Sequence, residues 1–178
     1  DEWLLPYFDN LTKDVIVLEA GSHIGFHTVY IAKRCKKVYA FEPQLINYDR
    51  LIKNLELNDV TNVICHNIAL YSKETKMSIE NIKKQKDFNY ASRQACSLVL
   101  NEDPEADIDA KTIDSFNFEK IDFLKTDCEE NDLHVLKGGV ETIKKYRPKI
   151  IFEYPQKNQD HYEFFKGLNY DVKEITGQ

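Results

Sequence analysis

Short apolar segments alternate along the chain with segments of helical periodicity. Five of them are rich in β-branched and aromatic residues, as strands buried on both faces of a sheet are: 15–18, 37–42, 63–70, 121–126 and 149–154. Apolar side chains recur at helical spacing between them, chiefly over 26–34, 45–57 and 131–146. This alternation predicts an α/β fold with a mainly parallel sheet and helices on both of its faces.

Residues 71–111 break this rhythm. Polar and apolar positions alternate over 76–82 and again over 95–100, which predicts an antiparallel hairpin inserted above the carboxyl ends of the strands. The connection between the two is polar, and the acidic stretch 102–109 is predicted to be a solvated loop. Towards the chain ends we expect a short helix or lid at 2–8, a helix at 160–166 and an edge strand at 170–175.

The clearest chemical signal follows the first strand. Gly21 and Gly25 bracket a tight turn between this strand and the next helix, which is half of a nucleotide-binding βαβ unit. The second strand ends at Glu42, followed by Pro43, and an acidic residue there can accept hydrogen bonds from both hydroxyls of a ribose. These features predict a site for an adenosine-containing cofactor.

The composition of the turn favours S-adenosylmethionine over a dinucleotide. A dinucleotide fingerprint has a central glycine where the backbone meets pyrophosphate, but this turn has His23 at that position, after Ser22. S-adenosylmethionine has no pyrophosphate, and Glu19, just before the turn, suits the ammonium of its amino-acid part. The alternatives are an NAD-dependent oxidoreductase, a cofactor-binding module without catalysis and a βα turn without any ligand.

Other polar residues stand at the ends of the remaining strands. Asn67 is expected to donate a hydrogen bond to an adenine ring, and Ile68 to pack on that ring, after the third strand. Asp127 ends the fourth strand and Glu153 the fifth. Ligands of open α/β sheets bind outside the carboxyl ends of the strands, so these residues and the glycine turn are expected to converge on one crevice.

Three segments resemble the FkbM-type S-adenosylmethionine-dependent methyltransferases: LEAGSHIGFHT at 18–28, VYAFEP at 38–43 and IDFLKTDCEENDLHVLKGG at 121–139. NIAL at 67–70 and IIFEYP at 150–155 add weaker support. The resemblance implies a Rossmann-like class I methyltransferase fold and O-methyltransfer, commonly to a sugar hydroxyl of a glycan or glycoside. Two positions depart from the family pattern, because Glu130 replaces a usual glycine and His23 a usual small or amide residue.

The resemblance places Asp127 and Glu129 at the two acidic positions that follow the fourth strand. Carboxylates there suit a hydroxyl acceptor, because one of them can take its proton; Glu153 and, after it, His134 are further candidates for this base. Repulsion between two carboxylates in the crevice would favour a proton on one of them. They could instead cap the following helix or hold Mg²⁺, although no metal is expected.

Composition narrows the range of partners. The net charge is −6 and no long basic run occurs, which argues against a nucleic acid partner and therefore against an RNA methyltransferase. No apolar stretch reaches transmembrane length and no signal peptide is visible, so no membrane partner is expected. The four cysteines lie far apart without a C-x-x-C pair, which is typical of reduced thiols in a cytoplasmic protein and not of a zinc site.

The chain of 178 residues is long enough for one domain with its own core, so 1–178 is interpreted as a single methyltransferase domain. It begins at Asp1 and not at a methionine, which is consistent with a domain excised from a longer polypeptide. The expected partner is a carbohydrate acceptor. A glycosyltransferase, fused to the chain or working with it, would suit that class of substrate.

Overall fold

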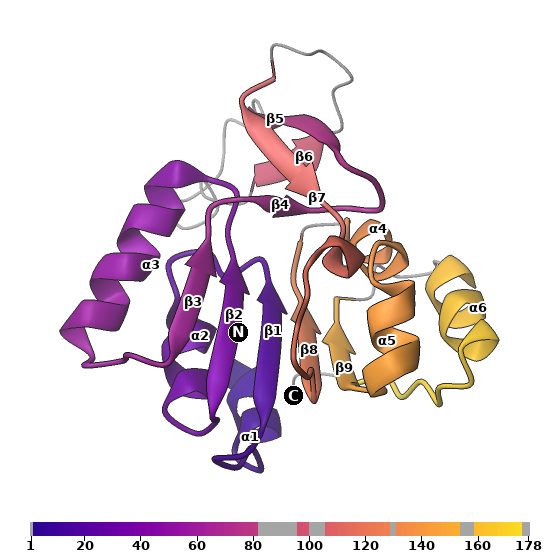
Figure 1. The fold of residues 1–178 in the computed structure, drawn as a ribbon, viewed down its shortest axis with the longest axis horizontal. Helices are drawn as coiled ribbons and strands as arrows, with labels where there is room; N and C mark the ends of the chain where they lie inside the picture. Colours follow the sequence, from indigo (N-terminus) through magenta and orange to yellow (C-terminus); the bar gives the residue numbers. More distant parts are fainter. Residues whose placement is uncertain (1, 82–95, 100–105, 129–130, 154–158, 176–178) are drawn as a thin grey trace.

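The computed structural model describes residues 2–81, 96–99, 106–128, 131–153 and 159–175 (Figure 1). Five of the described strands form one parallel sheet in the order β3-β2-β1-β8-β9. Their bounds are Val63–His66, Lys37–Phe41, Ile16–Ala20, Phe123–Thr126 and Lys149–Phe152, in that order. The predicted parallel sheet is confirmed, and four of its strands lie within two residues of their expected bounds. The third strand, predicted over 63–70, ends at His66, and Ala69–Leu70 form β4 of a second sheet.

The strand order reverses between β1 and β8. From β1 the chain moves outward to β2 and β3, and it later returns to place β8 on the other side of β1. In the β1–β8 pair Glu19 lies beside Lys125, and Ala20 beside Thr126. Ligands of open parallel sheets bind at the carboxyl ends of the strands next to such a reversal. The topology therefore predicts a ligand site at the carboxyl ends of β1, β2 and β8.

Helices cover both faces of this sheet, as predicted. One core combines Val17 of β1 with side chains of α1 (Leu5–Phe8), α2 (Phe26–Ala32) and α3 (Leu45–Leu57). The opposite core combines Leu18 with side chains of α4 (Asp132–Lys137), α5 (Val140–Tyr146) and α6 (Gln159–Gly167). Successive side chains of a strand point to opposite faces, which explains why neighbours in β1 enter different cores.

A second, smaller sheet lies above the carboxyl ends of the parallel strands (Figure 1). Its order is β4-β7-β5-β6, with bounds Ala69–Leu70, Ile108–Lys111, Thr75–Asn81 and Cys96–Val99. The antiparallel pair β5–β6 confirms the predicted hairpin, whose polar connection lies outside the described residues. The prediction of a loop up to residue 109 was wrong at its end, because Ile108 and Asp109 pair with β5.

Two further expectations need correction. The helix predicted over 131–146 is two helices, which are separated by a turn at Gly138 and Gly139. A Cβ at Gly138 would lie 2.0 Å from the carbonyl oxygen of Tyr71, so this close approach requires glycine. The edge strand predicted at 170–175 does not form. Tyr170 packs against Phe165 instead, and its hydroxyl donates to the carbonyl oxygen of Pro148 at 3.0 Å. The 3-10 turns Glu2–Leu4 and Ile113–Ser115 complete the described helical elements.

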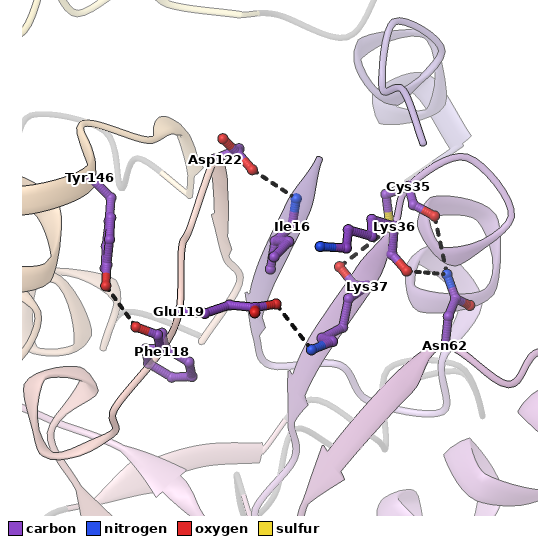
Figure 2. A network of polar contacts seen from close by, with 9 residues as sticks. All are labelled: Ile16, Cys35, Lys36, Lys37, Asn62, Phe118, Glu119, Asp122 and Tyr146. Carbon is purple, nitrogen blue, oxygen red and sulfur yellow. Dashed lines mark hydrogen bonds and ion pairs between the residues drawn. The ribbon is translucent and has the colours of Figure 1, made fainter. Parts of the chain in front are cut away.

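The amino ends of the parallel strands carry a network of polar contacts between protein groups (Figure 2). The Ile16 amide donates to Asp122 Oδ2 at 2.9 Å, and Lys37 Nζ lies 3.2 Å from Glu119 Oε1. The Asn62 amide donates to three carbonyl oxygens of residues 32–36. The polar groups named here bond to one another, so we assign this edge of the sheet a structural role.

Cys35, Cys65 and Cys128 are free thiols, in agreement with the prediction of reduced cysteines. Burial raises the pKa of Cys35 and of Cys65 to about 11, so both stay protonated at neutral pH. Within the part of the chain that the structure describes, no helix has both the length and the apolar character needed to cross a membrane.

Candidate functional site

The glycine turn is pressed between the ends of β2 and β8. The amides of Gly21 and Ser22 both donate to the carbonyl oxygen of Phe41, at 3.0 and 3.1 Å. Gly21 has a φ of 80°, and a Cβ on it would lie 2.0 Å from the carbonyl oxygen of Asp127. Only glycine fits such a conformation and such a close approach. Gly21 thus brings together three strand ends that are far apart in the sequence.

The second glycine sets the angle between the turn and α2. Gly25 precedes the helix with a φ of 89°, and its amide donates to the carbonyl oxygen of Ser22 at 2.9 Å. A Cβ at Gly25 would lie 2.6 Å from the Leu51 side chain of α3. The turn is therefore held in place at Gly21 by β8 and at Gly25 by α3.

Glu42 fixes the middle of the turn. Its Oε2 accepts a hydrogen bond from the His23 amide at 2.8 Å, and its Oε1 one from the Gln44 amide at 2.9 Å. The residue is 5% exposed, and burial raises the pKa of its carboxyl although these two hydrogen bonds act to lower it. A carboxylate oxygen has a second lone pair, so Glu42 can still accept from a ligand hydroxyl.

Asn67 lies beside Glu42, and its side-chain amide already donates hydrogen bonds to protein groups. Its amide nitrogen donates to the carbonyl oxygens of Glu42 at 2.8 Å and of Pro43 at 3.1 Å. Both amide hydrogens thereby have protein acceptors, so Oδ1 is the atom that Asn67 can offer to a ligand. These two bonds speak against the predicted donation to adenine, and a contact of Asn67 with a ligand stays a prediction. Ile68, half-buried, follows directly.

A buried charged group joins β1 to β8. Lys125 Nζ lies 3.3 Å from Glu19 Oε1 and 3.2 Å from Asp127 Oδ2. The exposed fraction of the side chain is 2% for Lys125, 0% for Glu19 and 31% for Asp127. Burial acts to lower the pKa of Lys125, but the two carboxylates outweigh it and the pKa is raised. Lys125 is therefore an ammonium held between two carboxylates.

Glu19 is also tied to the helix above it. The Thr28 hydroxyl of α2 donates to Glu19 Oε2 at 2.6 Å. The other oxygen of Glu19, Oε1, is buried without a hydrogen-bond partner among the described residues and lies 3.3 Å from the Lys125 ammonium. Its predicted contact with a ligand ammonium stays a prediction.

Two polar atoms of the turn are buried without a hydrogen-bond partner among the described residues. They are Ser22 Oγ and His23 Nε2. Burial lowers the pKa of His23, although the nearby Asp127 carboxylate acts in the opposite direction. The imidazole is therefore neutral at pH 7, with a ring nitrogen available to a ligand. Unpaired buried polar atoms cost free energy, so a ligand that pairs with them is favoured here.

A family model described as the methyltransferase FkbM domain matches residues 19–172. The chain belongs to this family. Methyltransferase 1 of Beauveria bassiana is 24% identical over an aligned length of 149 residues, and the alignment covers 70% of this chain and 58% of that protein. The chain thus spans little more than half the length of this relative.

Solved structures share the fold at low sequence identity. The FkbM methyltransferase of Methylobacillus flagellatus superposes with a TM-score of 0.64 at 17% identity, covering 89% of this chain and 38% of that one. A putative methyltransferase of Streptococcus mutans, SMU.1697c, was solved in complex with SAH; it gives a TM-score of 0.57 at 15% identity and covers 98% and 88%. The sheet is therefore that of a Rossmann-like methyltransferase.

The other candidate bases of this FkbM domain lie away from the glycine turn or outside the described residues. Glu129 lies outside the described residues, and so does Glu130, which replaces the glycine usual in the family. Glu153 is exposed after β9, the outer strand next to β8. His134 of α4 stacks on Tyr71 with ring centres 4.6 Å apart, and its Nδ1 lies 3.4 Å from Ser72 Oγ, beneath the small sheet. These residues stay predictions.

The alternative role of Asp127 as a helix cap is not what the structure shows. Asp127 pairs with Lys125, while Asp132 Oδ2 accepts from the Cys128 amide at 3.2 Å and so holds the loop before α4. Sequence reasoning missed Lys125 altogether. Its signal was a lysine near the end of the predicted strand IDFLKT, because a strand buried on both faces leaves a charged side chain no exit to solvent.

Proposed function

We propose that this FkbM-family chain is an S-adenosylmethionine-dependent O-methyltransferase that methylates a sugar hydroxyl of a glycan or glycoside. The observation that carries the proposal is the closure of the Gly21 turn onto Asp127, with Glu42 bonded to the same turn. It joins a ribose acceptor and a carboxylate at the ends of strands adjacent to the reversal in strand order. The family membership supports methyl transfer. The sugar hydroxyl is the acceptor that the sequence resemblance to the FkbM type implies.

The residues at this edge fit the chemical groups of S-adenosylmethionine. Glu42 would accept from the ribose hydroxyls, and Asn67 Oδ1 and Ile68 would meet the adenine. Ser22 Oγ and His23 Nε2, buried and unpaired among the described residues, would gain partners near the turn. When bound, the cofactor supplies an electrophilic methyl group on a positively charged sulfur.

Asp127 has two tasks in this proposal. Its carboxylate carries the charge that suits the ammonium at the amino-acid end of the cofactor. It is also the described carboxylate, part-exposed beside the turn, that can take the proton of an acceptor hydroxyl. Glu129 and Glu153 remain further candidates for the proton acceptor. Lys125 keeps one oxygen of Asp127 in a fixed place at 3.2 Å.

The test is a transfer assay with methyl-labelled S-adenosylmethionine and a panel of glycans and glycosides, alongside RNA and small phenols. Label in a sugar methyl ether, lost in Asp127→Asn, is the expected result. Label only in RNA or in phenols would contradict the carbohydrate acceptor while keeping methyl transfer. Cofactor binding without label in any acceptor would favour a module without catalysis.

A further inference from the structure

Lys125 is an unusual residue for the interior of a parallel sheet. Its side chain is 2% exposed, and the surrounding core is apolar, with Val17 and Phe123 on the same face of the sheet. Removing an ammonium from water is unfavourable unless carboxylates compensate for it. An apolar side chain at this position, together with an uncharged residue at 19, would avoid that desolvation. The charge therefore calls for a function beyond stability.

The contacts of Lys125 form a continuous path from helix α2 to the site. Thr28 of α2 holds Glu19 Oε2, and Glu19 Oε1 faces the ammonium of Lys125. Lys125 in turn donates to Asp127 Oδ2 at 3.2 Å. Residues two apart in a strand point to the same face, which is why Lys125 can reach Asp127. Asp127 is the member of this path with access to solvent.

The charges of the path do not cancel. Two carboxylates face one ammonium, which leaves one net negative charge at Asp127, the more exposed carboxylate. The neighbouring imidazoles add no positive charge at neutral pH, because burial lowers the pKa of both His23 and His27. A cationic ligand group beside Asp127 is therefore favoured.

We infer that Lys125 is a positioning residue, which holds the Asp127 carboxylate beside the glycine turn to receive the cationic amino-acid end of the cofactor. The inference rests on the proposed function, since it assumes that S-adenosylmethionine is the ligand. In the simpler alternative, Lys125 only compensates the buried charge of Glu19. The two differ in what happens when both buried charges are removed together.

The experiment is a double-mutant cycle read by calorimetric titration with S-adenosylhomocysteine, which keeps the ammonium and carboxylate of the cofactor. The wild-type chain, Asp127→Asn, the pair E19Q/K125M and the triple variant are compared, after thermal unfolding shows that each is folded. Glutamine at 19 can still accept from Thr28. Lys37→Met is the matched control, because Lys37 also pairs with a carboxylate, Glu119, but at the amino edge of the sheet (Figure 2).

We expect Asp127→Asn and E19Q/K125M each to weaken binding about tenfold, and the triple variant to bind no worse than about twofold below the pair. Lys37→Met should bind as the wild type does. If E19Q/K125M binds as tightly as wild type, or if Asp127→Asn costs its full factor in both backgrounds, Lys125 does not position Asp127. If the wild-type chain binds no S-adenosylhomocysteine, the proposed function itself fails and the inference falls with it.

A second measurement covers the case in which the Lys125 variants do not fold. Because the side chain of Lys125 is 2% exposed, we expect its ammonium to exchange slowly with water and to give a visible ¹H–¹⁵N signal in the folded wild-type chain. The signal should move in Asp127→Asn and on addition of S-adenosylhomocysteine to wild type. A Lys125 signal that Asp127→Asn moves and the ligand does not would overturn the inference.

Discussion

The Glu42 carboxylate accepts a hydrogen bond from the backbone amide of His23 at 2.8 Å, so the acid that ends β2 also holds the middle of the glycine turn. His23 has a φ of 50°, a conformation that non-glycine residues seldom adopt. Two parts of the site that lie on different strands are thereby one unit. A ligand that bonds to Glu42 meets a turn whose shape Glu42 itself maintains.

Replacing Glu42 by alanine should therefore damage both stability and binding. The amides of His23 and Gln44 would lose their acceptor, which we expect to cost about 1–3 kcal/mol in the free energy of unfolding. Affinity for S-adenosylhomocysteine should fall about tenfold or more as the ribose contact is lost. Urea unfolding and calorimetry measure the two effects. Glu42→Gln, which keeps one acceptor oxygen, should lie between wild type and alanine; equal binding by all three would refute the ribose role.

Gly21→Ala should unfold the turn or the domain. The new Cβ would lie 2.0 Å from the Asp127 carbonyl oxygen, and the φ of 80° adds strain of roughly 1–3 kcal/mol. The matched control is Gly167→Ala in α6, where no atom of the described residues lies within 4 Å of the added methyl group. That variant should stay within about 1 kcal/mol of wild type or gain stability. A Gly21→Ala chain as stable as the control would show that the turn does not press against β8.

The hydroxyl of Thr28 should matter more than its methyl group. Thr28→Val leaves a buried oxygen of Glu19 without its donor, which we expect to cost about 1–3 kcal/mol in chemical unfolding. Thr28→Ser keeps the hydroxyl and should lose less. A reversed order of the two variants would mean that packing, not the bond to Glu19, fixes α2 on the sheet.

Acidification from pH 8 to pH 6 should destabilise the fold. Burial lowers the pKa of each of the five histidines: His23, His27, His66, His134 and His161. The unfolded chain then binds more protons than the folded one as the pH falls through the ordinary histidine range near 6.5, so stability decreases there. Glu42 and Asp132, whose pKa values burial raises, act oppositely, because the folded chain takes up these protons first as the pH falls; their effect starts at the raised pKa values and is complete below the ordinary carboxyl range at about 4. Thermal unfolding across this range, with proton uptake measured by calorimetry in buffers of different ionisation heat, is the check. Stability that rises on acidification to pH 6 would contradict it.

The parallel sheet, and the glycine turn and the acid at its strand ends, were predictable because their signals are local. Apolar segments, two glycines and an acid at the end of the second strand each occur within a few residues, and Leu45–Leu57 has its expected bounds. Lys125 was not predictable in this way, since its partners Glu19 and Asp127 meet it only when β1 and β8 pair. The acidic stretch that leads into β7 is typical of a loop, and the end of this stretch is a strand only because it pairs with β5. The edge strand predicted at 170–175 does not form, because Tyr170 packs against Phe165 and not beside a strand.

The measurement that tests the central claim most directly is calorimetric titration of the purified chain with S-adenosylmethionine, S-adenosylhomocysteine and NAD in parallel. The account predicts micromolar binding of the first two and none of NAD, because the turn has His23 where a dinucleotide site has glycine. Binding of NAD without either adenosyl ligand would contradict the cofactor, and with it the proposed methyl transfer by this chain.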